Sequence, residues 1–247
     1  MVNSFHPGTT PKPFGAISIK NLEEQMTPKF SLALIALFCL TLTAALPAQT
    51  AANPAAPAPP SPAPATLTQA ERDAALKSLQ ETHDAFLKSI TGLSEKQWTF
   101  KPAPDRWSVA EVSEHIAISE STIFGLVQKQ FMASPAAPER RAEVKVTDQQ
   151  ILTMVPDRSR KAQAPEFLKP TNRWPAREEL VKAFEQNRTA TENYVRTTND
   201  DLRDHFGPHP LLGTMDVYQW ILLISAHSER HTKQIEEVKA DPNFPKE

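Results

Sequence analysis

The chain has 247 residues and a formal net charge of −2, and its length fits one or two domains. This charge provides no basic excess of the kind that nucleic-acid binding needs. With only 6 glycines and no Gly-rich phosphate-loop motif, the sequence also argues against a nucleotide-phosphate site. The one cysteine, Cys39, lies in the most hydrophobic stretch, which excludes an intrachain disulfide and, once that stretch is removed, a thiol nucleophile.

The first expected element is a secretory signal. Residues 30–46 form an uncharged apolar run that directly follows a short basic segment and precedes small residues. We expect a leader and signal peptide over residues 1–48, cleaved before Gln49 or, as an alternative, before Leu46. The product would be periplasmic or secreted. The competing interpretation is an uncleaved transmembrane anchor, for which a run of 17 residues is at the short limit.

The next segment, residues 49–66, is rich in alanine and proline and contains no large apolar side chain. Such a composition favours extended polyproline conformations over a packed core. We therefore expect a disordered Ala/Pro linker here. The folded domain is expected over residues 67–241, which is long enough to bury one sizeable core.

Four helices are expected in this domain, in chain order near residues 68–91, 108–133, 176–198 and 214–239. Thr68 and Ser108 each begin a capping box, with a glutamate three residues later. Pro175 suits a first helical position, and Thr214 is the expected N-cap of the last helix. Apolar residues recur at helical spacing in each segment, and no segment alternates with the period of a strand.

A polar segment punctuated by prolines, from about 135 to 174, separates the second helix from the third. One short helical turn is expected within it, near residues 148–154. The expected fold class is therefore all-α: a four-helix bundle with one long crossover between its second and third helices. The signal sequence and the Ala/Pro-rich linker precede it.

Three histidines are candidate metal ligands. His227 and His231 lie one turn apart, and their spacing from Ile224 and Ile235 places both on the buried face of the last helix. His115 has the same inward placement on the second helix. Three imidazoles that converge can bind one ion at about 2.0–2.1 Å, and zinc or nickel suits such neutral nitrogen ligands. The alternative is that all three are polar core residues, because many H-x₃-H pairs on helices are incidental.

Other polar residues near these helices have simpler explanations. Glu229 is rotated by about 200° from His227, so the H-E-x-x-H arrangement of zinc proteases is absent. We expect His83 to be a core histidine with hydrogen-bond partners rather than a fourth metal ligand. His205 and His209 are expected to be exposed in a loop. Gln234, about one turn beyond His231, is a candidate to support the metal ligands or is simply solvated.

The sequence resembles the DinB-like superfamily of four-helix bundles. The resemblance rests on residues 90–94 (I-T-G-L-S), on 101–112 (K-P-A-P-D-R-W-S-V-A-E-V) followed by His115, and on 227–235 (H-S-E-R-H-T-K-Q-I). It covers the whole expected domain. It implies that His115, His227 and His231 bind a divalent metal, zinc or nickel, at one end of the bundle. It also implies a water or a thiolate substrate ionised by that metal, because characterised relatives are thiol-dependent transferases of the cytosol.

Two classes of function follow. One is a metal-dependent enzyme, either a transferase of the thiol S-transferase type or a hydrolase; the other is a non-catalytic metal-binding or interaction module whose ion stabilises the bundle. The sequence contains no separate nucleophile that would identify catalytic residues. The expected partner is a small-molecule substrate, with a thiol as one candidate, and neither nucleic acid nor a membrane beyond the signal segment. A homodimer is a candidate assembly.

Overall fold

The computed structural model describes residues 66–246. The expected leader and signal peptide (1–48) and all but the last residue of the expected linker lie outside the described residues. Within the described part, no helix combines the length and the hydrophobicity that crossing a membrane requires.

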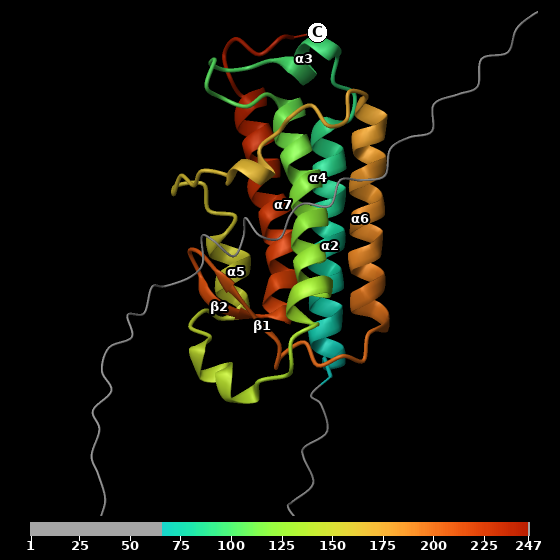
Figure 1. Cartoon of the computed structure of the whole chain (residues 1–247). Coiled ribbons are helices and arrows are strands. Elements are labelled where there is room, and N and C mark those ends of the chain that lie inside the picture. Colours follow the sequence, from blue (N-terminus) through green and yellow to red (C-terminus); the bar gives the residue numbers. More distant parts are fainter. Residues whose placement is uncertain (1–65, 247) are drawn as a thin grey trace, which may run out of the picture. The chain divides into compact units, whose positions relative to one another are not determined.

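Four long helices form a bundle (Figure 1), as predicted: α2 (Gln69–Ile90), α4 (Val109–Leu126), α6 (Arg177–Thr197) and α7 (Val217–Lys239). Each helix has two neighbours, and the neighbouring pairs are α2–α7, α7–α4, α4–α6 and α6–α2. Two of the three pairs of long helices that follow each other in the chain, α2 with α4 and α6 with α7, therefore lie on diagonals of the bundle, whereas α4 and α6 are neighbours. Figure 1 shows that α2 and α7 run in one direction, and that α4 and α6 run in the other.

The long crossover follows from this arrangement, because α4 and α6 are adjacent and point the same way. The chain that leaves α4 at one end of the bundle must return to the other end before α6 begins (Figure 1). This segment contains the 3₁₀ turns η2 (Pro138–Glu143) and η3 (Glu166–Leu168) and the short helix α5 (Asp148–Met154). The predicted crossover and its predicted short helix are thus confirmed. α5 packs against α7, and η3 lies against α4.

The helix starts show where local sequence signals are sufficient. Thr68 and Ser108 form the two predicted capping boxes. The prediction for Pro175 was wrong: Ala176 is the N-cap of α6, and the helix begins one residue later. A short helix that was not predicted, α3 (Glu95–Thr99), occupies the connection between α2 and α4.

The end of α4 also differs from the predicted continuous helix. After Leu126 the backbone widens into one π-helical turn, η1 (Val127–Phe131). Such a turn inserts a residue into the regular hydrogen-bond pattern and changes the direction of the side chains that follow it.

The all-α prediction needs one correction, which lies just before α7. Strands β1 (Phe206–His209) and β2 (Gly213–Asp216) form an antiparallel hairpin, with Phe206 opposite Asp216. Thr214 is therefore a strand residue, and the N-cap of α7 is Asp216, whose carboxylate accepts from the backbone N–H of Gln219. Four-residue strands that contain glycine or proline are too short to show alternation, which is why the sequence pattern did not predict them.

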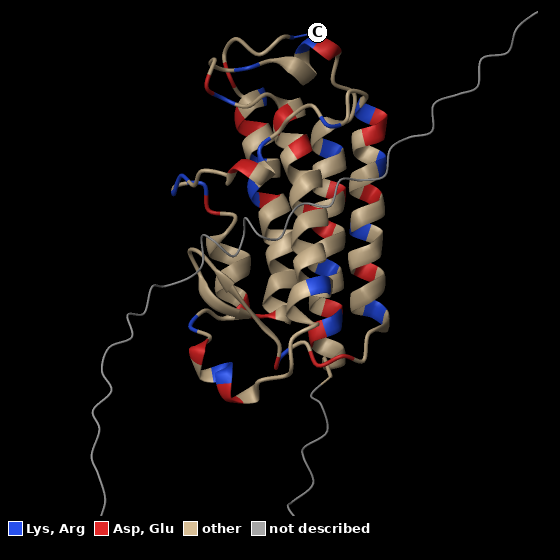
Figure 2. Cartoon of the chain, viewed as in Figure 1, with Lys and Arg blue, Asp and Glu red and all other residues tan. Residues whose placement is uncertain are grey.

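The core of the bundle consists of two apolar clusters separated by a polar layer. On α7 the first cluster covers residues 217–226 and the second includes Ile235 and Val238. Between them lie His227, Ser228, His231 and Thr232. Figure 2 shows charged residues along each of the four long helices, whereas residues 217–228 of α7 include no Lys, Arg, Asp or Glu. The polar layer is therefore an interruption inside the bundle, and the predicted histidines are part of it.

Replacement of Gly207 in β1 by alanine is expected to destabilise the fold by about 1–3 kcal/mol, as overpacking of a filled core does. A Cβ at Gly207 would overlap the ring of Phe131, which is itself packed against Trp220 at a centroid distance of 5.0 Å. Chemical denaturation measures the effect.

The matched control is Gly125→Ala in α4, because a Cβ there meets no atom within 4 Å. This helical substitution should stabilise the protein by about 0.5–1 kcal/mol. Equal effects of the two substitutions would contradict the described packing of β1.

Candidate metal centre

His115 reaches the interior because Ser108 fixes where α4 begins. The Ser108 hydroxyl accepts from the backbone N–H of Glu111, and the Glu111 carboxylate accepts from the backbone N–H of Ser108. From this start, Val112 and Ile116 face the core, and His115 lies beside them with 2% of its surface exposed. Its Nδ1–H donates to the backbone carbonyl of Leu168 in the crossover, at 2.8 Å.

His227 and His231 come from α7, on the side that faces α4. His231 is 9% exposed, and its Nδ1 lies 2.8 Å from Oε1 of Gln234. That oxygen also accepts from the guanidinium of Arg158 at 3.3 Å, which fixes the orientation of the amide. Gln234 thus contacts a candidate ligand, as one of the two sequence interpretations expected. His227 keeps partial solvent accessibility.

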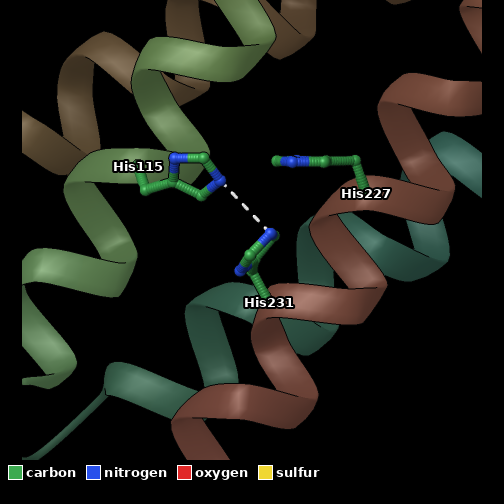
Figure 3. A group of neighbouring side chains, drawn as sticks. All are labelled: His115, His227 and His231. Atoms are coloured by element: carbon green, nitrogen blue, oxygen red, sulfur yellow. Dashed lines mark hydrogen bonds between the residues drawn. The ribbon is translucent and has the colours of Figure 1, made fainter. Parts of the chain in front are cut away.

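The three rings converge between the two helices (Figure 3). One ring nitrogen from each lies within 4.8 Å of the other two, and the Nε2 atoms of His115 and His231 are 3.2 Å apart. Nitrogens bound to one tetrahedral zinc ion at 2.0–2.1 Å are about 3.3–3.4 Å apart. The structure therefore brings together the three histidines that the sequence singled out, and the separation of the His115 and His231 nitrogens is close to that of two ligands of one ion.

Hydrogen bonding decides which nitrogens carry protons. The Leu168 carbonyl can only accept, and Gln234 presents its oxygen, so His115 and His231 both hold a proton on Nδ1. In their neutral forms both then direct an Nε2 lone pair into the same space, 3.2 Å apart. Two acceptors at this distance repel each other unless a cation lies between them. A metal ion satisfies both lone pairs, and the Nδ1 partners orient the rings as they do in known metal sites.

Protonation of one of these imidazoles does not supply that cation, because their pKa values are low. Burial lowers the pKa of His115 below its ordinary value of 6.5. Burial, followed by the proximity of the other histidines, lowers the pKa of His227 and His231 well below this value. The three imidazoles are therefore neutral at physiological pH, which is the form that binds metals.

The crossover covers one side of the cluster and is tied to α7 there. The Arg230 guanidinium donates to the backbone carbonyls of Val155, Asp157 and Arg160. Arg158 of the crossover forms a bidentate ion pair with Glu237 of α7, and both of its N–O distances are 2.7 Å. The sequence interpretation missed these contacts because the crossover has no periodicity that predicts which helix it covers.

The remaining candidate histidines lie outside the cluster. His83 stacks on Phe184 with ring centroids 5.7 Å apart and pairs with Asp84, so it is a packed histidine on α2. His205 was expected to be exposed, but it is half-buried, and its Nδ1 lies within hydrogen-bond distance of the carbonyl of Phe131. His209 was expected to be exposed, but it is half-buried against Trp220. Burial lowers its pKa to about 4.

A second polar group, missed from the sequence, fills the same layer of the core. Arg188 of α6 is 1% exposed and forms an ion pair with the buried Glu120 of α4. It also donates to the hydroxyls of Thr82 on α2, at 2.9 Å, and Ser228 on α7, at 3.1 Å. This group joins all four helices, and its carboxylate is fully engaged, so it offers no free base to the cluster.

In the metal-free protein, the free energy of unfolding should fall as the pH is lowered through about 6.5, where an unfolded histidine takes up a proton. Burial lowers the folded-state pKa of the three cluster histidines. The unfolded state therefore binds more protons between the two pKa values, and stability is lost as the pH falls. Each imidazole contributes a slope of up to about 1.4 kcal/mol per pH unit in that window.

Denaturant titrations between about pH 8 and pH 5 measure this slope, with a triple His115→Gln/His227→Gln/His231→Gln variant as the control. Other titrating groups, including His209 and Asp216, contribute equally to both proteins. The triple variant should show the shallower dependence, and parallel curves would contradict neutral burial of the cluster.

The chain is similar to known proteins over most of its described residues. Residues 78–235, which include all three clustered histidines, match a family model described as "DinB superfamily". The uncharacterized protein YuaE of Bacillus subtilis (strain 168) is 24% identical over 150 residues, which are 61% of this chain and 88% of that protein. A solved structure, YfiT from Bacillus subtilis, is described as "a probable metal-dependent hydrolase with an unusual four-helix bundle topology". It aligns with a TM-score of 0.45 and 13% identity over 78% of this chain and 97% of its own.

Proposed function

The chain belongs to the DinB superfamily, and from this premise we propose that it is a metal-dependent enzyme. His115, His227 and His231 would hold one divalent ion, zinc or nickel. The observation that carries this proposal is the pair of Nε2 lone pairs that face each other at 3.2 Å, each fixed by a hydrogen bond at Nδ1. Such an arrangement is unfavourable without a cation and favourable with one.

A catalytic role is favoured over a purely structural one by the composition of the cluster. Structural zinc sites are closed by four protein ligands, whereas catalytic sites have three and keep an open position. Within residues 66–246 the cluster has three members, all histidines. No fourth protein ligand completes the cluster within these residues, which leaves a coordination position for a small ligand.

The ion would supply a Lewis acid that lowers the pKa of a water or a thiol and polarises a substrate. The residues of this chain hold and orient it: Leu168 and Gln234 keep the imidazoles of His115 and His231 in the tautomer that presents Nε2. Trp107 packs against the ring of His115 at a centroid distance of 5.0 Å and shields it from solvent.

Two reactions use such a centre: hydrolysis, with water as the nucleophile, and thiol transfer, with a low-molecular-weight thiol as a second substrate. We place hydrolysis first because it needs no second substrate. It also suits an exported protein, since the thiol-dependent relatives act in the cytosol. Export itself is part of the proposal and rests on the signal-like residues 26–48.

The test is a substrate screen with zinc- or nickel-loaded protein against esters and amides, with and without an added thiol. Metal-dependent turnover that is absent from the His227→Gln variant is the expected result. A requirement for the thiol would identify a transferase. Stoichiometric metal that raises the melting temperature without any turnover would instead identify an ion that only stabilises the bundle.

A further inference from the structure

Glu114, the residue before His115, has an unusual environment for a carboxylate. It is 5% exposed, and its hydrogen bonds come from three successive backbone N–H groups of the crossover. Thr171 and Arg173 donate to Oε1 at 2.8 and 2.9 Å, and Asn172 donates to Oε2 at 2.9 Å. Backbone N–H groups turned together in this way form an anion-binding concavity, and here a side chain of α4 fills it.

The segment held by Glu114 needs such an anchor. Asn172 has a positive φ of 59°, a backbone conformation that is uncommon for residues other than glycine. Without the carboxylate, these three successive N–H groups would lose their only acceptor within the described part of the protein. The conformation of residues 171–173 therefore depends on Glu114.

The same segment supplies the acceptor for His115. The Leu168 carbonyl, three residues before Thr171, accepts from Nδ1 of His115 at 2.8 Å. Two consecutive residues of α4 thus hold the two ends of one short stretch of crossover, 168–173. Consecutive helical residues point about 100° apart. The Glu114 carboxylate can therefore contact residues 171–173 while Nε2 of His115 points toward His231 of α7.

We propose that Glu114 is a positioning residue for the metal centre: by anchoring residues 171–173 it places the Leu168 carbonyl that fixes the tautomer and the ring orientation of His115. This inference rests on the proposed metal-binding function. It gives the buried carboxylate a role that is neither ligation nor general-base catalysis. Loss of such a supporting contact typically weakens metal affinity about 10- to 100-fold while all ligands remain.

The first test is nuclear magnetic resonance of the imidazole protons in wild type and in Glu114→Gln, without metal. A glutamine offers one acceptor oxygen and places an amide N–H against the backbone donors. The protected Nδ1–H signal of His115 should be lost in this variant, whereas the Nδ1–H signal of His231, which is held by Gln234, should persist. This readout does not depend on metal, so it separates failure of the inference from failure of the proposed function.

The second test is zinc affinity, measured by competition with a chromophoric chelator at a temperature where each variant is folded. Glu114→Gln should bind zinc about 10- to 100-fold more weakly than wild type. The control is Asp216→Asn, another buried carboxylate that accepts from a backbone N–H. Asp216 is the N-cap of α7. It lies about 16 Å along the helix axis from His227. It should lose stability with unchanged zinc affinity.

Glu114→Asp keeps the carboxylate and provides a variant that retains the charge if glutamine prevents folding. It should give partial protection of the His115 Nδ1–H and an intermediate affinity. An unchanged His115 signal in Glu114→Gln or, failing that, in Glu114→Asp would overturn the inference. So would a zinc affinity within about twofold of wild type in a variant whose stability has fallen, because a supporting contact is worth more than this.

Discussion

Replacement of His231 by glutamine is expected to abolish stoichiometric metal binding and to remove the contribution of the metal to stability. His231 is the residue whose Nε2 faces that of His115 at 3.2 Å, so its loss leaves two ligands and no short nitrogen pair. Bound metal stabilises the folded state by about 4 kcal/mol when its free concentration is about 1,000 times the dissociation constant. Thermal unfolding with and without added zinc, together with elemental analysis, measures both effects.

His83→Gln is the matched control for this prediction. His83 is also an inward-facing helical histidine, but it stacks on Phe184 outside the cluster. This variant should retain its metal and its metal-dependent increase in melting temperature. Equal metal content in wild type and His231→Gln, or loss of metal from His83→Gln, would show that the cluster is not the binding site.

Replacement of Arg188 by leucine is expected to lower the free energy of unfolding by about 3–5 kcal/mol, the usual cost of leaving a buried charge without its partner. Arg188 and Glu120 are both almost fully buried, and leucine would leave the Glu120 carboxylate in the core with only Ser228 as a donor. Equilibrium denaturation measures the change. Because Ser228 is next to His227, the metal content of the variant reports whether the two polar groups are coupled.

The double variant Arg188→Leu/Glu120→Leu separates the charge from the shape of the site. Apolar replacement of both partners of a buried ion pair is often neutral or stabilising, so the double variant should recover much of the stability that the single variant loses. If the free energy of unfolding of Arg188→Leu lay within about 1 kcal/mol of wild type, the described buried ion pair would be contradicted, since exposed ion pairs contribute no more than this.

The bundle could be predicted because its signals are local and repeated. Capping boxes at Thr68 and Ser108 fixed the first two helix starts, and helical spacing gave the buried face of each helix. The inward direction of His115, His227 and His231 follows from the same spacing. Whether they meet depends on α4 lying beside α7, and the helical pattern does not determine this. In a bundle in which every pair of successive long helices is adjacent, α4 and α7 would instead lie on a diagonal.

The features that were missed depend on contacts between distant segments. Arg188 falls on the inner stripe of α6, yet an arginine there is normally expected in solvent, and its partner Glu120 is on another helix. Glu114 looks like an ordinary helical glutamate until residues 171–173 are placed against it. The hairpin before α7 was missed for a different reason, because four-residue strands such as 206–209 have too few positions to show a pattern.

The most direct test of the metal centre is a crystal structure of the zinc- or nickel-loaded protein, with diffraction data collected on both sides of the absorption edge of that metal. An anomalous peak between α4 and α7, about 2.0–2.1 Å from one ring nitrogen of each of His115, His227 and His231, is the expected result. The Nδ1 atoms of His115 and His231 should keep their contacts with Leu168 and Gln234. A loaded crystal with no peak among these histidines, or with the metal bound elsewhere, would contradict the assignment and leave the three residues as polar members of the core.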